Sequence, residues 1–218
     1  MATMSRRTFL MSSAVLLASS SYVKPVHSEK SNALPAKFDL DRFTEDVKRA
    51  RAEDDSQKAV EEVIARAVSD RRAVLRALGE PQQAQVETLY RDSDVSIFNL
   101  VWAPRMVLMP HNHLMWASIG VYTGREDNIM WERTGQTIQA STATALSNGE
   151  VFSLPSDAIH SVVNPINRLS GAIHVYGGDL TVVKRSQWDP ETLREQPFDF
   201  EEGRRLFREA NERLNVGR

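Results

Sequence analysis

Four of the five histidines of this 218-residue chain lie between residues 111 and 174. His111 and His113 are two residues apart, so an extended strand would point both imidazoles to the same face. Two imidazoles on one face can chelate a divalent metal. The chain contains no cysteine, which excludes thiolate metal sites, disulfides and a cysteine nucleophile. The alternative is that each histidine is an ordinary hydrogen-bonded residue of a core or a surface.

Two short motifs surround these histidines. The first is the pair His111 and His113, followed about one strand later by Gly124. The second consists of a glycine, a proline, a histidine and an asparagine, separated by five, four and three residues, at Gly149, Pro155, His160 and Asn164. Together they resemble the two motifs of the cupin family, although Asp157 stands where that family usually has glycine. The resemblance implies a β-barrel in which His111, His113 and His160 bind one metal ion.

The predicted site lacks the carboxylate ligand of many cupins. That ligand is a glutamate four or five residues after the histidine pair, and the corresponding residues here are Ala117 and Ser118. Glu126, on the expected following strand, is the remaining candidate for a fourth ligand. Three neutral imidazoles would leave the metal its full charge and open positions for an anionic substrate and oxygen.

Three-histidine cupins of this kind resemble the thiol dioxygenases, typified by cysteine dioxygenase. That family carries a His-x-Tyr pair after its third ligand, matched here by His174 and Tyr176, fourteen residues beyond His160. The resemblance implies Fe(II), or another divalent metal, as cofactor, with His174 and Tyr176 as catalytic residues that steer substrate and oxygen. A serine usually stands two residues before that histidine, and Ala172 replaces it here, which predicts a shortened relay.

The implied substrates are a small thiol and O2, and the product is a sulfinic acid. Arg91 stands where the family has a carboxylate-binding arginine and is the predicted substrate-binding residue; Arg105 and Arg168 are its rivals. An arginine suits this role because its fork pairs with both carboxylate oxygens. Two other functions stay open: a metal-binding cupin without turnover, acting as a sensor or binding module, and a dioxygenase for a carbon substrate.

The elements that must position these residues are β-strands, predicted over residues 83–190. Short runs rich in valine, isoleucine, leucine and aromatic residues alternate there with turn residues, a pattern typical of a sandwich or barrel. The expected strands are 95–102, 106–109, 116–122, 128–133, 151–154, 159–163, 171–176 and 180–184. The predicted fold is therefore mainly β, a cupin double-stranded β-helix with N-terminal helices and a short C-terminal helix.

Helical segments flank the predicted barrel. Residues 29–82 read as a linker followed by helices from about residue 39, with Phe43, Val47 and Ala50 at helical spacing. Gly79 and Pro81 end this segment, whose expected role is to cover a face or an edge of a sheet. Residues 191–218 form the predicted C-terminal extension, with a helix over 200–214.

Residues 1–28 have the pattern of an export signal. Arg6 and Arg7 precede an apolar run from Phe9 to Ala18, which is shorter than the roughly 20 residues that span a bilayer. A paired arginine before a short apolar segment resembles a twin-arginine signal, which predicts a periplasmic protein. The segment removed would include or border His27, which we therefore exclude as a ligand.

The net charge of −2 argues against nucleic acid as a partner, because no basic field is available to hold phosphates. No membrane span is predicted in the mature chain. The sequence leaves the oligomeric state open.

Overall fold

The computed structural model describes residues 38–53 and 55–216, so the predicted signal of residues 1–28 and the linker up to residue 37 lie outside the described residues. Three helices come first along this part of the chain: α1 (Leu40–Arg51), α2 (Ser56–Ser69) and α3 (Arg71–Leu78). Aspartates cap all three, at Asp39, Asp55 and Asp70, by accepting a hydrogen bond from a first-turn backbone N–H. Gly79, at a φ of 84°, ends α3 as expected.

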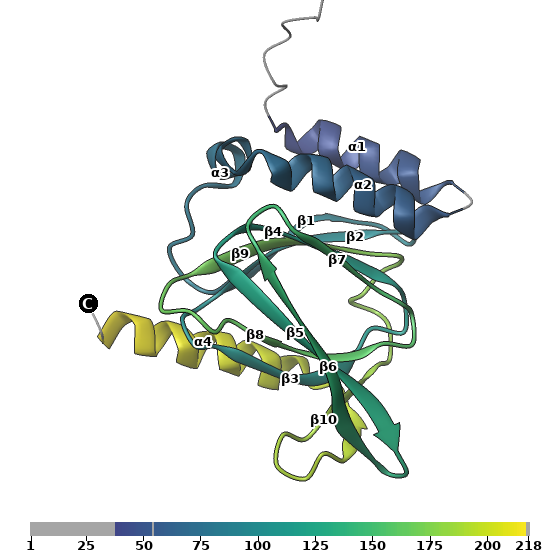
Figure 1. Cartoon of the computed structure of the whole chain (residues 1–218), viewed down its shortest axis with the longest axis vertical. Helices are drawn as coiled ribbons and strands as arrows, with labels where there is room; N and C mark the ends of the chain where they lie inside the picture. Colours follow the sequence, from purple (N-terminus) through teal and green to yellow (C-terminus); the bar gives the residue numbers. More distant parts are fainter. Residues whose placement is uncertain (1–37, 54, 217–218) are drawn as a thin grey trace, which may run out of the picture. The chain divides into compact units, whose positions relative to one another are not determined.

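These helices cover the outer face of a sheet, as predicted (Figure 1). Phe43, Val47 and Ile64 belong to one buried cluster together with Ile173 and Val175 of the sheet. The contact between α2 and the sheet is close: a Cβ atom on Gly120 would lie 2.3 Å from the Ile64 side chain. A glycine at this position is therefore what lets α2 lie directly on the strand.

Two antiparallel sheets form the barrel. The first has five strands in the order β1 (Gln85–Arg91), β2 (Ser96–Trp102), β9 (Ser170–Tyr176), β4 (Ala117–Thr123) and β7 (Val151–Leu154). The second has six strands in the order β11 (Glu195–Pro197), β10 (Ser186–Trp188), β3 (Val107–Asn112), β8 (Ile159–Val163), β5 (Arg125–Thr134) and β6 (Thr137–Ser147). The prediction of a mainly β, double-stranded β-helix fold of the cupin type is confirmed.

Some strand predictions were wrong in detail. Residues 180–184 form turns and irregular chain, and the strand that follows is β10, after the buried Arg185. Strand β6 was missed because most of its residues are exposed and its sequence is rich in threonine, alanine and serine. Strand β10 joins β3, and β11, paired with β10, extends the six-stranded sheet past residue 190.

The C-terminal helix α4 (Phe200–Val216) begins at the predicted residue and ends two residues after the predicted residue 214. Asn211 ties it to the chain just before β1, donating to the Ala84 carbonyl at 2.9 Å and accepting from the Ala84 N–H at 2.7 Å. Phe207 packs on Trp102 of β2, with ring centroids 5.4 Å apart. Among the described residues, no helix combines the length and the apolar character needed to cross a membrane.

Candidate metal centre

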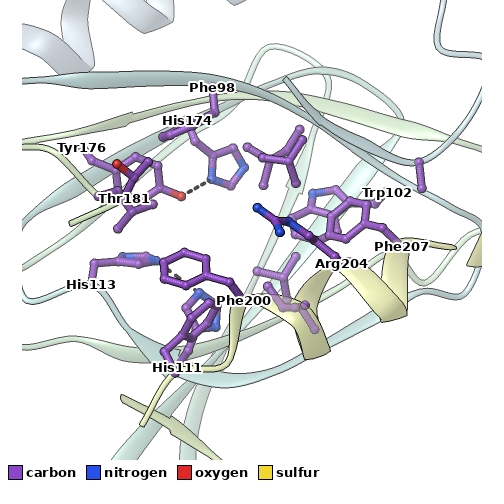
Figure 2. Close-up of a pocket in the computed structure, with 18 of the residues that line it drawn as sticks. Phe98, Trp102, His111, His113, His174, Tyr176, Thr181, Phe200, Arg204 and Phe207 are labelled. Atoms are coloured by element: carbon purple, nitrogen blue, oxygen red, sulfur yellow. Dashed lines mark hydrogen bonds between the residues drawn. The ribbon is translucent and has the colours of Figure 1, made fainter. Parts of the chain in front are cut away.

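The barrel holds a pocket of about 570 Å³, lined by the predicted metal ligands and the predicted catalytic residues (Figure 2). His111 and His113 lie at one end, with His174 and Tyr176 of the facing sheet above them. Trp102 and Phe207 lie at the other side. The remaining lining is mostly apolar. The structure thus brings together the five histidine and tyrosine residues predicted from the sequence: His111, His113, His160, His174 and Tyr176.

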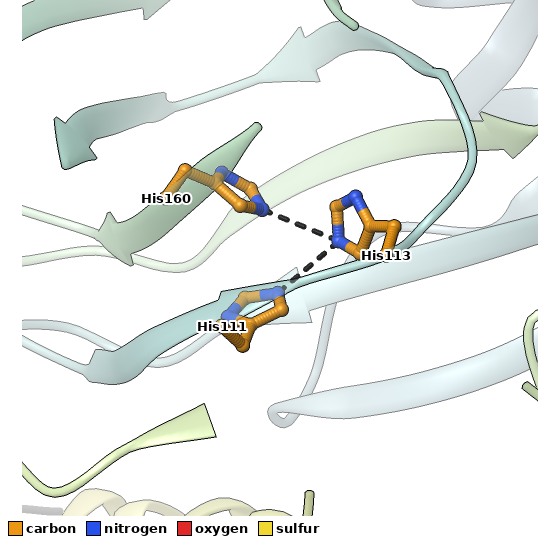
Figure 3. Close-up of side chains that lie close together, drawn as sticks. All are labelled: His111, His113 and His160. Carbon is orange, nitrogen blue, oxygen red and sulfur yellow. Dashed lines mark hydrogen bonds between the residues drawn. The ribbon is translucent and has the colours of Figure 1, made fainter. Parts of the chain in front are cut away.

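The register of two neighbouring strands places the first two nitrogen ligands. His111 on β3 lies directly opposite His160 on β8. His113 follows the end of β3, in a turn where Leu114 has a φ of 57°. The Nε2 atom of His113 lies 3.2 Å from that of His111 and 3.3 Å from that of His160 (Figure 3). All three side chains are buried.

Hydrogen bonds behind two of the rings determine their tautomers. His111 Nδ1 lies 2.9 Å from the Met109 carbonyl oxygen, which can only accept. His160 Nδ1 lies 2.7 Å from Asn128 Oδ1, and this amide is oriented because its Nδ2 donates to Glu126 at 3.1 Å. Both rings therefore carry their proton on Nδ1 and present an Nε2 lone pair to the centre of the cluster.

The geometry of the three histidines is explained better by a bound divalent metal than by hydrogen bonds among the rings. His113 Nε2 could donate a hydrogen bond to only one of the two lone pairs that face it, and His113 Nδ1 is buried without a partner. Two nitrogens bound to one ion at about 2.1 Å lie roughly 3.0–3.4 Å apart, which matches the observed separations of 3.2 and 3.3 Å. The three ligand nitrogens all lie within 4.8 Å of one another.

Burial keeps these imidazoles neutral. Desolvation, and then the neighbouring histidines, lower the pKa values of His111 and His113 well below the ordinary value of 6.5. Burial likewise lowers the pKa of His160 to about 3. The neutral imidazole is the form that binds metals.

Glu126 lies behind the cluster rather than in it. Its fully buried carboxylate accepts hydrogen bonds from Trp102 Nε1 at 2.7 Å, Asn128 Nδ2 at 3.1 Å and His174 Nε2 at 3.2 Å. Burial alone would raise the pKa of Glu126, but the charge and hydrogen bond of His174 and the two other donors outweigh it and lower that pKa. The metal-ligand cluster found among the described residues consists of the three histidines, so Glu126 as a fourth ligand is not supported.

His174 and Tyr176 form the inner end of a hydrogen-bonded chain. His174 Nδ1 lies 3.2 Å from the Tyr176 hydroxyl, while its Nε2 contacts Glu126. The predicted shortening of this relay was wrong: with Ala172 in place of serine, the carboxylate of Glu126 holds the far side of His174. The chain continues through Asn128 to His160, so one carboxylate orients both a metal-site histidine and the tyrosine.

Arg185, which sequence reasoning missed, is one of three arginines that line this pocket, with Arg204 and Arg208 of α4. Its side chain is 9% exposed, and its guanidinium lies over the Phe198 ring, 3.3 Å from the centroid. Nη1 donates to the Asn112 carbonyl, whereas Nε is buried without a partner. None of the ion pairs between described residues involves Arg185. Burial lowers the pKa of Arg185 to about 10, so this residue is still a cation at neutral pH.

The arginines predicted from the sequence lie elsewhere. Arg91 is half exposed on β1, where it pairs with Asp179 at 3.6 Å, and it does not line the pocket. Arg105 is exposed and donates to Asn167, and Arg168 is also exposed. Arg91 also donates to Thr181 Oγ1 at 3.0 Å, so its side chain is held by Asp179 and Thr181, and the structure does not bring it to the histidines.

A comparison with models of known protein families finds no match. Similar solved structures include an RmlC-like cupin family protein with a double-stranded β-helix fold from Methanocaldococcus jannaschii (12% identity, 47% of this chain and 87% of that one, TM-score 0.38). A cupin superfamily protein from Desulfitobacterium hafniense has 15% identity over 48% of this chain and 88% of that one (TM-score 0.38). Oxalate decarboxylase from Bacillus subtilis, described for its Mn(II) centres, has 16% identity over 40% of this chain and 22% of that one (TM-score 0.35).

Similarity at this distance concerns the fold, so we base the function on the side chains of this chain. The chain has the double-stranded β-helix fold of the cupins, and its barrel brings together three buried histidines that could hold a divalent metal.

Proposed function

We propose that this chain is an iron(II)-dependent dioxygenase that converts a thiol bearing a carboxylate into a sulfinic acid. The observation that carries the proposal is the pairing of two features in one pocket. Three neutral imidazoles converge on one point, and the unpaired cation of Arg185 lies beside them. The choice of iron and of a thiol comes from the resemblance to three-histidine thiol dioxygenases, and the choice of a carboxylate comes from Arg185.

The charge of the site favours an anionic ligand. The three imidazoles contribute no negative charge, and the nearest carboxylate, Glu126, is engaged by three donors. A divalent ion here would keep its full charge, which lowers the pKa of a bound thiol. Arg185 would pair with the carboxylate of the same molecule and so hold its sulfur end toward the histidines.

Bound iron would supply the means to bring thiolate and O2 together, so that both oxygen atoms pass to sulfur and the thiol becomes a sulfinic acid. The chain's own residues bind and orient. Tyr176 packs against His113, with ring centroids 4.8 Å apart, and its hydroxyl is held by His174. Tyr176 is thus placed to form a hydrogen bond with the reacting sulfur or oxygen. Trp102 and Phe98 line the pocket and exclude water.

Oxygen uptake tests this function. The full chain, loaded with Fe(II) without oxygen, is supplied with O2 and cysteine, 3-mercaptopropionate or cysteamine, the last of which lacks a carboxylate. We expect iron-dependent uptake of one O2 per thiol, abolished in His160→Ala. Arg185→Met should slow uptake with the two carboxylates and leave the cysteamine rate unchanged. Stoichiometric iron without uptake, for thiols that bind, would refute the proposal and favour a metal-binding module, or a dioxygenase for a carbon substrate if a diol consumes oxygen.

We also propose that the protein works in the periplasm. The support is the sequence of residues 5–18, with Arg6 and Arg7 before a short apolar run. Twin-arginine systems move folded proteins, so the metal could be loaded before export. Replacing both arginines by lysine should leave the protein in the cytoplasm, as cell fractionation would show; unchanged export would contradict this assignment.

A further inference from the structure

The pocket is far larger than a small thiol requires. It measures about 570 Å³, whereas a dry cavity of about 150 Å³ accommodates benzene, which has as many non-hydrogen atoms as 3-mercaptopropionate. A small thiol bound beside the histidines would therefore fill only about a quarter of the space. The remainder would hold on the order of ten carbon atoms, if each carbon with its hydrogens takes about 30 Å³, the volume of one water molecule in the liquid.

The walls of this remaining space are mostly apolar, with polar groups at Thr88 and on α4. They are formed by β2, β3, β8 and α4, through Phe98, Leu100, Trp102, Leu108, Val162 and Phe207. The polar atom of Trp102 does not face a ligand, because its Nε1 donates to Glu126 at 2.7 Å. A polar substrate body would lose its hydration against these six side chains without gaining a hydrogen bond from them, so they favour an apolar one.

Helix α4 closes this side of the pocket and is anchored at both ends. Near its start, Glu202 accepts from Gln187 of β10 at 2.6 Å, and near its end Asn211 forms two hydrogen bonds with Ala84. Between these anchors, Phe207 faces Trp102, and Arg204 extends toward the space between them and His174 (Figure 2). The wall is therefore a fixed part of the fold.

The charged residues that line the pocket are all cations. Arg185 lies at the histidine end, and Arg204 and Arg208 belong to α4; no acidic residue is among the lining residues that the structure describes. Arg204 is paired with Glu201, whereas Arg185 has no ion-pair partner of that kind. An anionic group is thus expected at the histidine end, with the apolar body directed toward Trp102 and Phe207.

We propose that the ligand is an amphipathic carboxylate, whose head binds beside the histidines at Arg185 and whose apolar body of about ten carbons lies between Trp102 and α4. The inference rests on the proposed function for the thiol group of the substrate, and on the pocket alone for the body. Phe207 is then a specificity-determining residue, because it is the aromatic side chain of α4 that faces Trp102 across this space.

Binding of straight-chain carboxylates tests this inference without any oxygen chemistry. Butanoate, octanoate and dodecanoate are titrated calorimetrically into the full chain loaded with Fe(II) in the absence of O2. Each buried methylene tightens binding by about two- to fourfold, so octanoate should bind at least about tenfold more tightly than butanoate. The gain should level off once the chain exceeds the pocket.

Three variants show where binding occurs. Phe207→Ser should leave butanoate affinity unchanged and reduce the gain with chain length at least about threefold. Leu206→Ser is its matched control, since Leu206 also packs on the core cluster from α4 but does not line the pocket. Arg185→Met should weaken all three carboxylates about tenfold or more. Circular dichroism of each variant confirms that the fold persists.

The outcomes separate this inference from the proposed function. Equal affinity for butanoate, octanoate and dodecanoate would overturn the inference. A gain in affinity with chain length that Phe207→Ser and Arg185→Met leave unchanged would also overturn it, because the carboxylates would then bind elsewhere on the surface. Long carboxylates that bind as expected to a protein that oxidises no thiol would uphold the pocket and refute the dioxygenase. Turnover of small thiols, together with equal affinity for carboxylates of all chain lengths, would support the dioxygenase and refute the proposed apolar ligand body.

Discussion

Replacing Glu126 by glutamine should weaken metal binding, although Glu126 is not itself a ligand. The carboxylate accepts three hydrogen bonds, from Trp102, His174 and Asn128. A glutamine has only one acceptor oxygen, so its NH2 group must face at least one of these donors. If the oxygen stays with Trp102 and His174, the NH2 group meets the Nδ2 of Asn128, and the Asn128 amide must rotate.

That rotation would reach the metal site through His160. Rotated, Asn128 would offer its NH2 group to His160 Nδ1, which must then accept, so the ring proton would move to Nε2, the atom that faces the cluster. The loss of one charge-assisted hydrogen bond and the mismatch of buried donors should cost about 2–4 kcal/mol of stability. Loss of such a supporting partner typically lowers metal affinity about 10- to 100-fold.

The assay is competition for Fe(II) against a chelator without oxygen, together with urea unfolding of the metal-free chain. Glu132→Gln is the matched control, because Glu132 lies on the same strand, β5, with an exposed side chain. We expect Glu132→Gln to behave like the wild type. Equal iron affinity and equal stability for Glu126→Gln and Glu132→Gln would refute the role of Glu126.

Three further predictions follow from the site and from the helix layer. Tyr176→Phe should bind iron like the wild type but take up oxygen about 100-fold more slowly; equal rates would show that the hydroxyl takes no part. The metal-free chain should lose stability between pH 7 and pH 5.5, because its buried histidines resist protonation while those of the unfolded chain take up protons below about 6.5. With the pKa of His160 near 3, this loss is about 1.2 kcal/mol for His160, measured by urea unfolding, and His111 and His113, whose pKa values are also lowered, add to it. The loss should shrink in His160→Asn. Gly120→Val should destabilise the fold by about 1–3 kcal/mol, because the new side chain would overlap Ile64 of α2. Gly203→Ala is the control and should not destabilise the fold, because nothing lies within 4 Å of the new Cβ atom. Equal effects of the two substitutions would contradict the close contact between α2 and the sheet.

Local spacing predicted the parts of the site that depend on single motifs. The spacing of His111, His113 and His160 was sufficient because the two motifs lie on neighbouring strands whose register places His111 opposite His160. The helical layer was predictable for a similar reason, since the apolar spacing and the Gly79 end signal are local properties. Exposed strand β6, with few apolar residues, carried no such signal.

Two features depend on contacts between distant segments: the role of Glu126, which was predicted only as a possible ligand, and the position of Arg185, which was missed. Glu126 reaches His174 only because β5 and β9 belong to facing sheets, and no spacing along the chain expresses that contact. Its inward direction could have been inferred from Asn128, two residues along the same strand. Arg185 lies in irregular chain before β10, and its position depends on stacking against Phe198. A charged residue in a loop is usually exposed. Nothing in the sequence therefore favoured Arg185 over Arg91 as the carboxylate-binding residue.

The central claim is tested most directly by the fate of oxygen. The iron-loaded chain is given 3-mercaptopropionate and isotopically labelled O2, and the product is examined by mass spectrometry. The account predicts a sulfinic acid in which both oxygen atoms carry the label, formed only with iron and absent in His160→Ala. A product without label, or a disulfide in place of the sulfinic acid, would contradict it.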